Sequence, residues 1–212
     1  MSEQLIIAVS KGRIFREALP LLARLNIIPS DDPDETRKLI LETNQKHIKL
    51  IIIRATDVPA YVEYGAADMG IVGKDILMEY DGFNIYEPLD LKIAKCRMVL
   101  AGFKERETNK LRPRIATKYV NSTRRFFTNR GIQVEIIKLY GSMEIAPVLG
   151  LADQIVDLVD TGNTLKANGL VPLEVISEIS SRLIVNKASM KIKHRTIKDL
   201  ITGMSGILDN QK

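Results

Sequence analysis

The stretch Asp157-Leu158-Val159-Asp160-Thr161-Gly162-Asn163-Thr164-Leu165-Lys166-Ala167-Asn168-Gly169 decides how this chain is interpreted. An apolar run with β-branched residues, residues 155–159, leads into a Thr-Gly-Asn-Thr turn. Helix-compatible residues follow, and Asn168-Gly169 is a typical helix stop. We therefore expect a strand, a tight loop and the start of a helix, which is the repeating unit of an α/β fold.

A loop of this kind aims several backbone N–H groups and the hydroxyls of Thr161 and Thr164 at one point, which suits a phosphate dianion. Asp157 and Asp160 are placed to accept hydrogen bonds from sugar hydroxyls. Together these features indicate a site for a phosphoribosyl group. The alternative is an ordinary helix after a buried strand, with Thr161 as its N-cap.

Composition limits the classes of partner. The chain has 212 residues, of which 45% are hydrophobic, with 31 Lys and Arg against 26 Asp and Glu, a net charge of +5. These values are typical of one large or two small globular domains. The basic residues are scattered and only 5% of the residues are aromatic, so we expect an anionic small-molecule ligand and no nucleic-acid partner.

Few residues are available for metal, thiol or membrane chemistry. Cys96 is the only cysteine and His47 and His194 are the only histidines, which disfavours a histidine-based metal site or a Cys/His nucleophile. The apolar neighbours of Cys96 predict a buried, inert thiol. No targeting signal and no apolar run of membrane-spanning length is visible, so no membrane partner and a cytoplasmic location are expected.

Strand-like and helix-like patterns alternate along the chain and restart near residue 95, which predicts two α/β lobes with mostly parallel sheets and a central cleft. Expected strands cover residues 5–9, 39–43, 49–54, 68–72, 85–89, 97–101, 114–117, 134–139, 155–159, 173–179 and 182–186. Expected helices cover residues 12–25, 57–64, 75–80, 122–129 (capped by Asn121 or Ser122), 143–149 (interrupted by Pro147) and 194–208. The polar stretch 104–112 is expected to be a loop.

Charged loops follow several of the strands, at the edge where open α/β sheets bind ligands. In Ser10-Lys11-Gly12-Arg13, the two cations could clamp a pyrophosphate or triphosphate while Gly12 lets the backbone approach. The alternative for this loop is a solvated basic turn. Arg37 and Lys38 precede a strand and could likewise reach a phosphate or be solvated.

Arg54 ends a buried strand, where an arginine is costly unless it is paired or faces a ligand. The alternative is that Asp57 is simply an N-cap with which Arg54 pairs. A third loop, residues 70–75, holds Gly73 and Lys74 but lacks the P-loop spacing. No Gly-x-Gly-x-x-Gly is present, which argues against a dinucleotide-binding fold.

A further loop, Tyr140-Gly141-Ser142-Met143-Glu144, offers hydroxyls that could complete the phosphate cradle. Glu144 could face a ribose or a base, although the helix dipole alone favours an acidic residue in a first turn. Each loop is a weak signal by itself. Five such loops at strand ends form a much stronger combined one.

Six stretches of the chain resemble a known protein family. The matching stretches are Ser-Lys-Gly-Arg-Ile (10–14), Arg-Ala-Thr-Asp-Val-Pro (54–59), Asp-Met-Gly-Ile-Val-Gly-Lys-Asp (68–75), Arg-Ile-Ala-Thr-Lys-Tyr (114–119), Gly-Ser-Met-Glu-Ile-Ala-Pro (141–147) and Gly-Leu-Ala-Asp (150–153). Their order and spacing resemble the short form of ATP phosphoribosyltransferases over residues 5 to about 186.

The resemblance implies a two-lobed fold like type II periplasmic binding proteins. Residues 1–92 with 180–212 would form the first lobe, on the ATP and pyrophosphate side, and residues 93–179 the second, which carries the phosphoribosyl loop. It also implies transfer of a phosphoribosyl group from phosphoribosyl pyrophosphate to N1 of ATP, the first step of histidine biosynthesis, with Mg2+ arriving with the substrates and no protein metal site.

Site roles follow from the same matches. Lys11, Arg13 and Arg54 would act on the pyrophosphate and ATP phosphates as catalytic cations. The remaining substrate-binding residues would be Ser10, Gly12, Arg37, Asp57, Gly73, Glu144, Asp157, Asp160, Thr161, Gly162, Asn163 and Thr164. The regulatory domain of long-form relatives would be missing. A homodimer and a hetero-oligomer with a subunit resembling histidyl-tRNA synthetase are therefore expected.

The predicted chemistry agrees with the residues present. N1 of adenine carries a lone pair and no proton, so its attack on the anomeric carbon needs no strong base. Catalysis would consist of positioning and electrostatic stabilisation of the departing pyrophosphate. Three alternatives remain: an anion-binding sensor on the same fold, a phosphoribosyltransferase of the commoner, differently folded class, and a nucleic-acid-binding protein.

Overall fold

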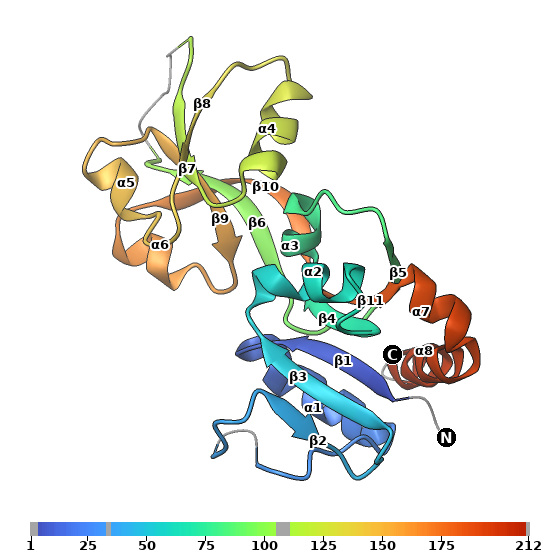
Figure 1. Cartoon of the computed structure of the whole chain (residues 1–212). Coiled ribbons are helices and arrows are strands. Elements are labelled where there is room, and N and C mark those ends of the chain that lie inside the picture. The colour runs from blue at the N-terminus through green and yellow to red at the C-terminus, as the bar shows by residue number, and fades with distance from the viewer. Residues whose placement is uncertain (1–3, 33–34, 105–110, 211–212) are drawn as a thin grey trace. The chain divides into compact units, whose positions relative to one another are not determined.

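The computed structural model describes residues 4–32, 35–104 and 111–210. The chain divides into two units. Unit 1 comprises Met1–Ala94 with Ser180–Lys212, and unit 2 comprises Lys95–Ile179. Each unit is built around its own sheet (Figure 1), and unit 1 is discontinuous in sequence because the last strand of the chain belongs to its sheet.

The sheet of unit 1 has six strands in the order β2-β3-β1-β4-β11-β5. Only β1 pairs in parallel, with β3 and with β4, whereas the other three pairings are antiparallel. The expectation of a mostly parallel sheet is therefore wrong. The strands are β1 (Leu5–Ser10), β2 (Ile40–Glu42), β3 (Ile48–Ile53), β4 (Met69–Gly73), β5 (Ile85–Asp90) and β11 (Ser181–Asn186).

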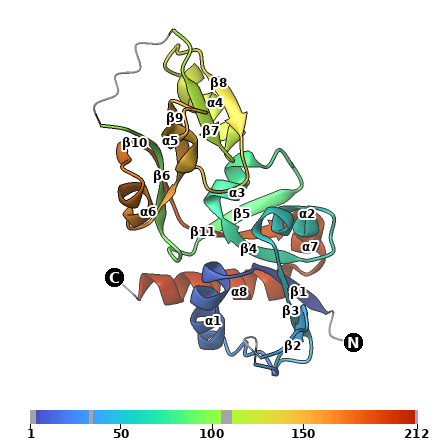
Figure 2. The same cartoon turned by 90° about the vertical axis from the view of Figure 1, so that its left-hand side faces the viewer.

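Helices cover both faces of this sheet. Alternation along β1 sends Ile7 and Val9 to one face, where they pack with Leu22 and Met204, and Ala8 to the other, where it packs with residues of α2. Figure 2 shows α1 and α8 crossing on the same side of the sheet. The helices are α1 (Arg13–Arg24), α2 (Val58–Glu63), α3 (Lys74–Glu79), α7 (Lys187–Ile192) and α8 (His194–Asp209), with a 3-10 turn η1 (Ala55–Asp57) before α2.

Helix α7 was not predicted from the sequence. It has six residues, too few for an apolar period to be visible. Its start is fixed by Asn186, whose side-chain oxygen accepts a hydrogen bond of 2.8 Å from the backbone N–H of Ser189.

The sheet of unit 2 has the order β10-β6-β9-β7-β8, with β7 parallel to β8 and β9 and the other two pairings antiparallel. Figure 1 shows α5 and α6 on one side of it and α4 on the other. The elements are β6 (Cys96–Gly102), β7 (Arg114–Thr117), β8 (Glu135–Lys138), β9 (Gln154–Val159), β10 (Val171–Ile179), α4 (Val120–Thr128), α5 (Ile145–Val148) and α6 (Asn163–Ala167).

Three local expectations are wrong in unit 2. Helix α4 begins at Val120 with Tyr119 at its N-cap, so Asn121 and Ser122 lie inside the first turn instead of capping it. Pro147 does not interrupt its helix, because α5 is a single short turn, and proline is tolerated in a first turn. Cys96 is half-buried, not buried, because it is the first residue of β6. Of the loop expected at 104–112, residues 105–110 lie outside the described residues.

Candidate active site

Within unit 2, three loops gather at one edge of the sheet. Strands β7, β8 and β9 run parallel, so their carboxyl ends lie at the same edge. Helices α4 and α6 follow β7 and β9 after the short loops of residues 118–119 and 160–162, and α5 follows β8 after the loop of residues 139–144. The amino-terminal ends of these three helices therefore lie toward this edge. In α5 the first N–H groups, those of Ile145 and Ala146, already donate to the carbonyls of Ser142 and Met143.

The Thr-Gly loop connects the end of β9 to α6. Gly162 has φ 81°, in the left-handed region that favours glycine, and it occupies the N-cap of α6. The alternative in which Thr161 is the N-cap is therefore wrong. The Thr161 hydroxyl accepts only a long contact of 3.5 Å from the N–H of Asn163. The side chains of Thr161, Asn163 and Thr164 are exposed, as a ligand-binding loop requires.

The predicted carboxylates lie around this loop. Asp157 is half-buried on the β9 face that also carries Ile155 and Val159, and its Oδ1 accepts a hydrogen bond of 2.8 Å from the backbone N–H of Leu158. Asp160 is exposed at the entrance of the loop, and Glu144 is half-buried at the N-cap of α5.

Two cations at this edge were missed by the sequence analysis. Lys118 directly follows β7, so it lies at a strand end like the predicted site residues. Its Nζ lies 4.8 Å from the centre of the Tyr119 ring. Arg97 is opposite Val159 because β6 runs antiparallel to β9. No sequence signal marks Arg97, since its place depends on that pairing.

The predicted residues of unit 1 gather at the carboxyl edge of the other sheet. Ser10 lies opposite Ile53 in the β1/β3 register, and the N–H of Lys11 bonds the Ile53 carbonyl at 2.8 Å. Arg54 therefore follows β3 beside the Lys11 loop. Strand β2 runs antiparallel to β3, so Arg37, which precedes β2, is attached at the same edge.

The cations at this edge differ in their partners. Arg13 pairs with Glu17 at 2.7 Å and Lys74 with Glu87 at 2.6 Å. Lys11, Arg37 and Arg54 are exposed and form no ion pair with the residues that the structure describes. Three guanidinium or ammonium groups are thus available to an anionic ligand.

The alternative for Arg54 is right in one part and wrong in the other: Asp57 does occupy the N-cap position of α2, but Arg54 does not pair with it. Asp57 accepts a hydrogen bond of 3.1 Å from the Thr56 hydroxyl, makes no side-chain cap and does not pair with Arg54. The argument that Arg54 is costly to bury does not apply either, because the side chain is exposed. Arg54 is thus a cation at the end of a buried strand with no ion-pair partner in the described part of the chain.

The small residues of this edge have specific environments. Gly12 has φ 93° at the N-cap of α1. A side chain at Gly73 would meet the buried Asp75 carboxylate, since an added Cβ would lie 2.1 Å from its Oδ1. The hydroxyl of Ser10 is fully buried and has no hydrogen-bond partner in the described part of the chain.

Glu17 connects this edge to the segment that leaves unit 1. Its carboxylate accepts hydrogen bonds from the Arg13 side chain and, at 2.7 Å, from the backbone N–H of Ala94, the last residue before unit 2. Partial burial favours the neutral acid, but these two donors outweigh it and lower the pKa of Glu17 below its ordinary value.

Two features are absent from residues 4–32, 35–104 and 111–210. No group of three or more His, Cys, Asp or Glu side chains among them is arranged to hold a metal ion. No helix among them is long and apolar enough to cross a membrane.

Known proteins resemble the chain throughout its length. The model of the ATP phosphoribosyltransferase family matches residues 54–206. The ATP phosphoribosyltransferase of Nitrosococcus oceani is 64% identical over 211 residues, covering 100% of this chain and 99% of that protein.

Solved structures agree with these matches. The ATP phosphoribosyl transferase (HisG:HisZ) complex from Thermotoga maritima contains a chain that is 33% identical, with a TM-score of 0.84 over 98% of this chain and 100% of that one. The probable amino-acid ABC transporter extracellular-binding protein ytmK from Bacillus subtilis has a TM-score of 0.59 at 11% identity, over 99% of this chain and 94% of that one. The latter likeness shows only a shared two-lobed α/β fold. By the extent and identity of these matches, the chain belongs to the ATP phosphoribosyltransferase family.

Proposed function

We propose that this chain transfers the phosphoribosyl group of phosphoribosyl pyrophosphate to N1 of ATP and releases pyrophosphate, the first step of histidine biosynthesis. The new bond joins N1 to the anomeric carbon, and the bond from that carbon to the pyrophosphate oxygen breaks. The observation that carries the proposal is the exposed Thr-Gly loop at the start of α6, in a chain that is 64% identical to an ATP phosphoribosyltransferase.

The loop would bind the 5′-phosphate of the ribose. Backbone N–H groups at the start of α6 and the hydroxyls of Thr161 and Thr164 are donors for its oxygens, and the left-handed Gly162 keeps the approach free of a side chain. Asn163 would complete the cradle. These donors fix the substrate in position, and positioning is a large part of catalysis in a reaction without a strong base.

The unpaired cations of unit 1 would stabilise the leaving group. Lys11 and Arg54 are exposed and unpaired among the described residues, so they can bind pyrophosphate without breaking an ion pair. Arg13 would have to exchange Glu17 for the ligand. Arg37 would contact ATP, with the surrounding loops formed by Ser10, Gly12, Asp57 and Gly73.

Carboxylates would act on the sugar and on the metal. Asp157, Asp160 and Glu144 are acceptors for ribose hydroxyls and would stabilise positive charge on the ribose. Mg2+ is bound in proteins through one or two carboxylates together with substrate phosphates, so this donor set fits an ion that arrives with the substrates. Bound there, Mg2+ would supply positive charge for the departing pyrophosphate.

A partner subunit is part of the proposal. The Thermotoga maritima relative was solved as a HisG:HisZ complex. We propose that this chain likewise assembles with a regulatory subunit resembling histidyl-tRNA synthetase, that it forms a homodimer within that assembly, and that it works in the cytoplasm.

The reaction is tested by incubating the purified chain with ATP, phosphoribosyl pyrophosphate and Mg2+, with pyrophosphatase added to draw the equilibrium forward. Mass spectrometry should detect an adduct of ATP and one phosphoribosyl group only when both substrates are present. If neither the chain alone nor the chain supplied with a HisZ-type subunit forms this adduct, the proposed function is rejected.

A further inference from the structure

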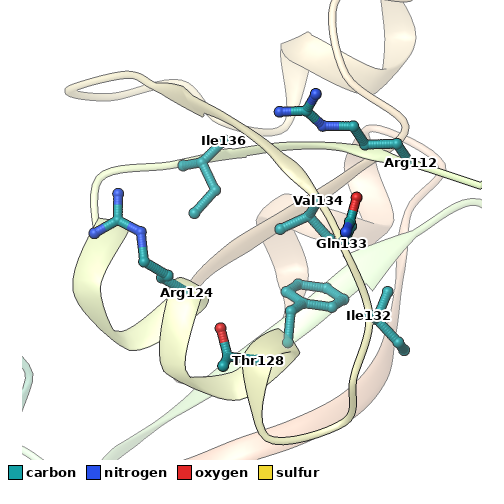
Figure 3. Close-up of a pocket in the computed structure, with 8 residues that line it drawn as sticks. Arg112, Arg124, Thr128, Ile132, Gln133, Val134 and Ile136 are labelled. Atoms are coloured by element: carbon teal, nitrogen blue, oxygen red, sulfur yellow. The ribbon is translucent and has the colours of Figure 1, made fainter.

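A second candidate ligand site lies at the other end of the unit 2 sheet. A cavity of about 530 Å3 lies between α4 and β8 (Figure 3) and is lined by Arg112, Arg124, Phe127, Thr128, Ile132, Gln133, Val134 and Ile136. Arg112 precedes β7, and residues 132–134 precede β8. The cavity is therefore at the amino ends of these strands, whereas the Thr-Gly loop follows the carboxyl end of β9.

The charged side chains that line the cavity are both positive. Both Arg112 and Arg124 are exposed, and neither forms an ion pair with residues 4–32, 35–104 or 111–210. No carboxylate is among the described lining residues. Glu135 is the nearest acidic residue along β8, but strand alternation sends it to the face opposite Val134 and Ile136.

The shape and the polar groups complete a ligand site. Figure 3 shows the Arg112 and Arg124 side chains on either side of Val134 and Ile136, whose apolar atoms form the surface between them. Gln133 and the hydroxyl of Thr128 supply neutral donors and acceptors. Ligand sites in proteins have this volume and this combination of an apolar wall with a few polar groups.

We propose that this cavity binds a small organic phosphate, with its phosphate oxygens on Arg112 and Arg124 and its carbon body over Val134 and Ile136. Planar guanidinium groups bind phosphate through paired, charge-assisted hydrogen bonds. Two such groups separated by an apolar surface favour a ligand that carries two phosphates over one that carries a single phosphate. The ligand would bind at a site separate from the loops that are proposed to bind the substrates.

The test uses fructose 1,6-bisphosphate as the probe and the arginine Nε–H signals in 15N NMR spectra as the readout. The full chain is titrated at constant ionic strength, so that general charge screening does not change. The Arg112 and Arg124 signals should shift, and fructose 6-phosphate should bind more weakly than the bisphosphate. Neutral fructose is the matched ligand control.

Variants locate the site. Arg112→Gln and Arg124→Gln should each raise the dissociation constant of the bisphosphate about tenfold, because each removes one charge-assisted contact. Arg125→Gln is the matched control, since Arg125 is the next residue of α4 and does not line the cavity; it should leave the constant unchanged. The proposal is overturned if the bisphosphate shifts neither arginine signal at millimolar concentration, or if all three variants weaken binding equally.

Discussion

At the scale of single residues, the 5′-phosphate is proposed to bind to the Thr-Gly loop. Thr161→Ala removes one hydroxyl donor from an exposed position and leaves the backbone cradle in place. We expect KM for phosphoribosyl pyrophosphate to rise about tenfold, the value of one hydrogen bond to a charged group, with kcat little changed. Steady-state kinetics against Thr202→Ala, an exposed threonine on α8, checks this. Unchanged kinetics would refute the cradle.

Arg54 is expected to affect turnover, whereas Thr161 is expected to affect substrate binding. Its side chain is exposed and unpaired among the described residues, so Arg54→Ala should fold normally. The loss of one cation that stabilises the leaving group should lower kcat by about 10²- to 10³-fold, by analogy with the loss of an oxyanion donor. Arg195→Ala, at an exposed position on α8, is the control. Near-normal turnover of a folded Arg54→Ala protein would reject the catalytic role.

The position of most candidate site residues in the fold could be predicted, because they are loop residues directly after apolar runs. What could not be predicted is their partner. The pairing of Arg13 with Glu17 was missed, although the i,i+4 spacing was visible. The absence of an Arg54–Asp57 pair and the position of Arg97 opposite Val159 depend on side-chain directions and strand pairing that a sequence pattern does not specify.

At the scale of elements, a buried charge cluster ties the C-terminal helices to the first strand. Asp68, which is 5% exposed, accepts hydrogen bonds from the N–H of Ile6 at 2.9 Å, from the Ser189 hydroxyl at 2.6 Å and from Lys193 at 2.8 Å. All three donors point at one carboxylate, so an amide of the same size cannot satisfy them.

Asp68→Asn should therefore lower the free energy of unfolding by about 3 kcal/mol, the usual cost of removing one partner of a buried ion pair. Urea unfolding followed by circular dichroism measures this. Asp199→Asn, an exposed substitution on α8, should change stability by less than about 0.5 kcal/mol. Equal effects of the two substitutions would show that the cluster does not anchor α7 and α8.

A second carboxylate at an element end predicts a pH dependence. Partial burial favours the neutral form of Asp90, but hydrogen bonds from the Ser180 hydroxyl and the Lys92 N–H, with Arg182 nearby, lower its pKa below the ordinary value. A lowered pKa means that this stabilisation is present above the unfolded value of about 3.9 and is lost as the pH falls through the folded value.

Asp90→Asn should thus reduce stability at neutral pH and make the acid loss of stability shallower. Urea unfolding between neutral pH and about pH 3 compares it with Asp81→Asn, which removes an exposed carboxylate. The interpretation fails if the two variants lose stability in parallel with the parent chain as the pH falls.

Strands and longer helices could be predicted from apolar periodicity, because long buried segments repeat the pattern several times. Sheet direction could not. Strand β11 enters the unit 1 sheet directly from unit 2 and pairs antiparallel with β4 and β5. Strand β6 enters the unit 2 sheet directly from unit 1 and pairs antiparallel with β9. Neither pairing leaves a mark on the alternation of apolar residues. The start of helix α7 is a short-range feature fixed by the side-chain cap of Asn186, whereas the N-cap of α4, Tyr119, makes no side-chain cap.

At the scale of the whole molecule, each unit carries one group of candidate ligand-binding loops at the carboxyl edge of its own sheet. Unit 2 carries the phosphate loop and its carboxylates, and unit 1 carries the unpaired cations. This division matches the two parts of the proposed reaction, the ribose phosphate that stays with the product and the pyrophosphate that leaves.

The proposed transfer is tested most directly by the bond that joins the two substrates in the product. The chain, alone and with a HisZ-type subunit, is supplied with ATP labelled with 15N at N1 and phosphoribosyl pyrophosphate labelled with 13C at the anomeric carbon. We expect a one-bond coupling between the two labels that appears only with the protein and both substrates. A product without this coupling, or labelled ATP that stays unchanged under both conditions, would contradict the account.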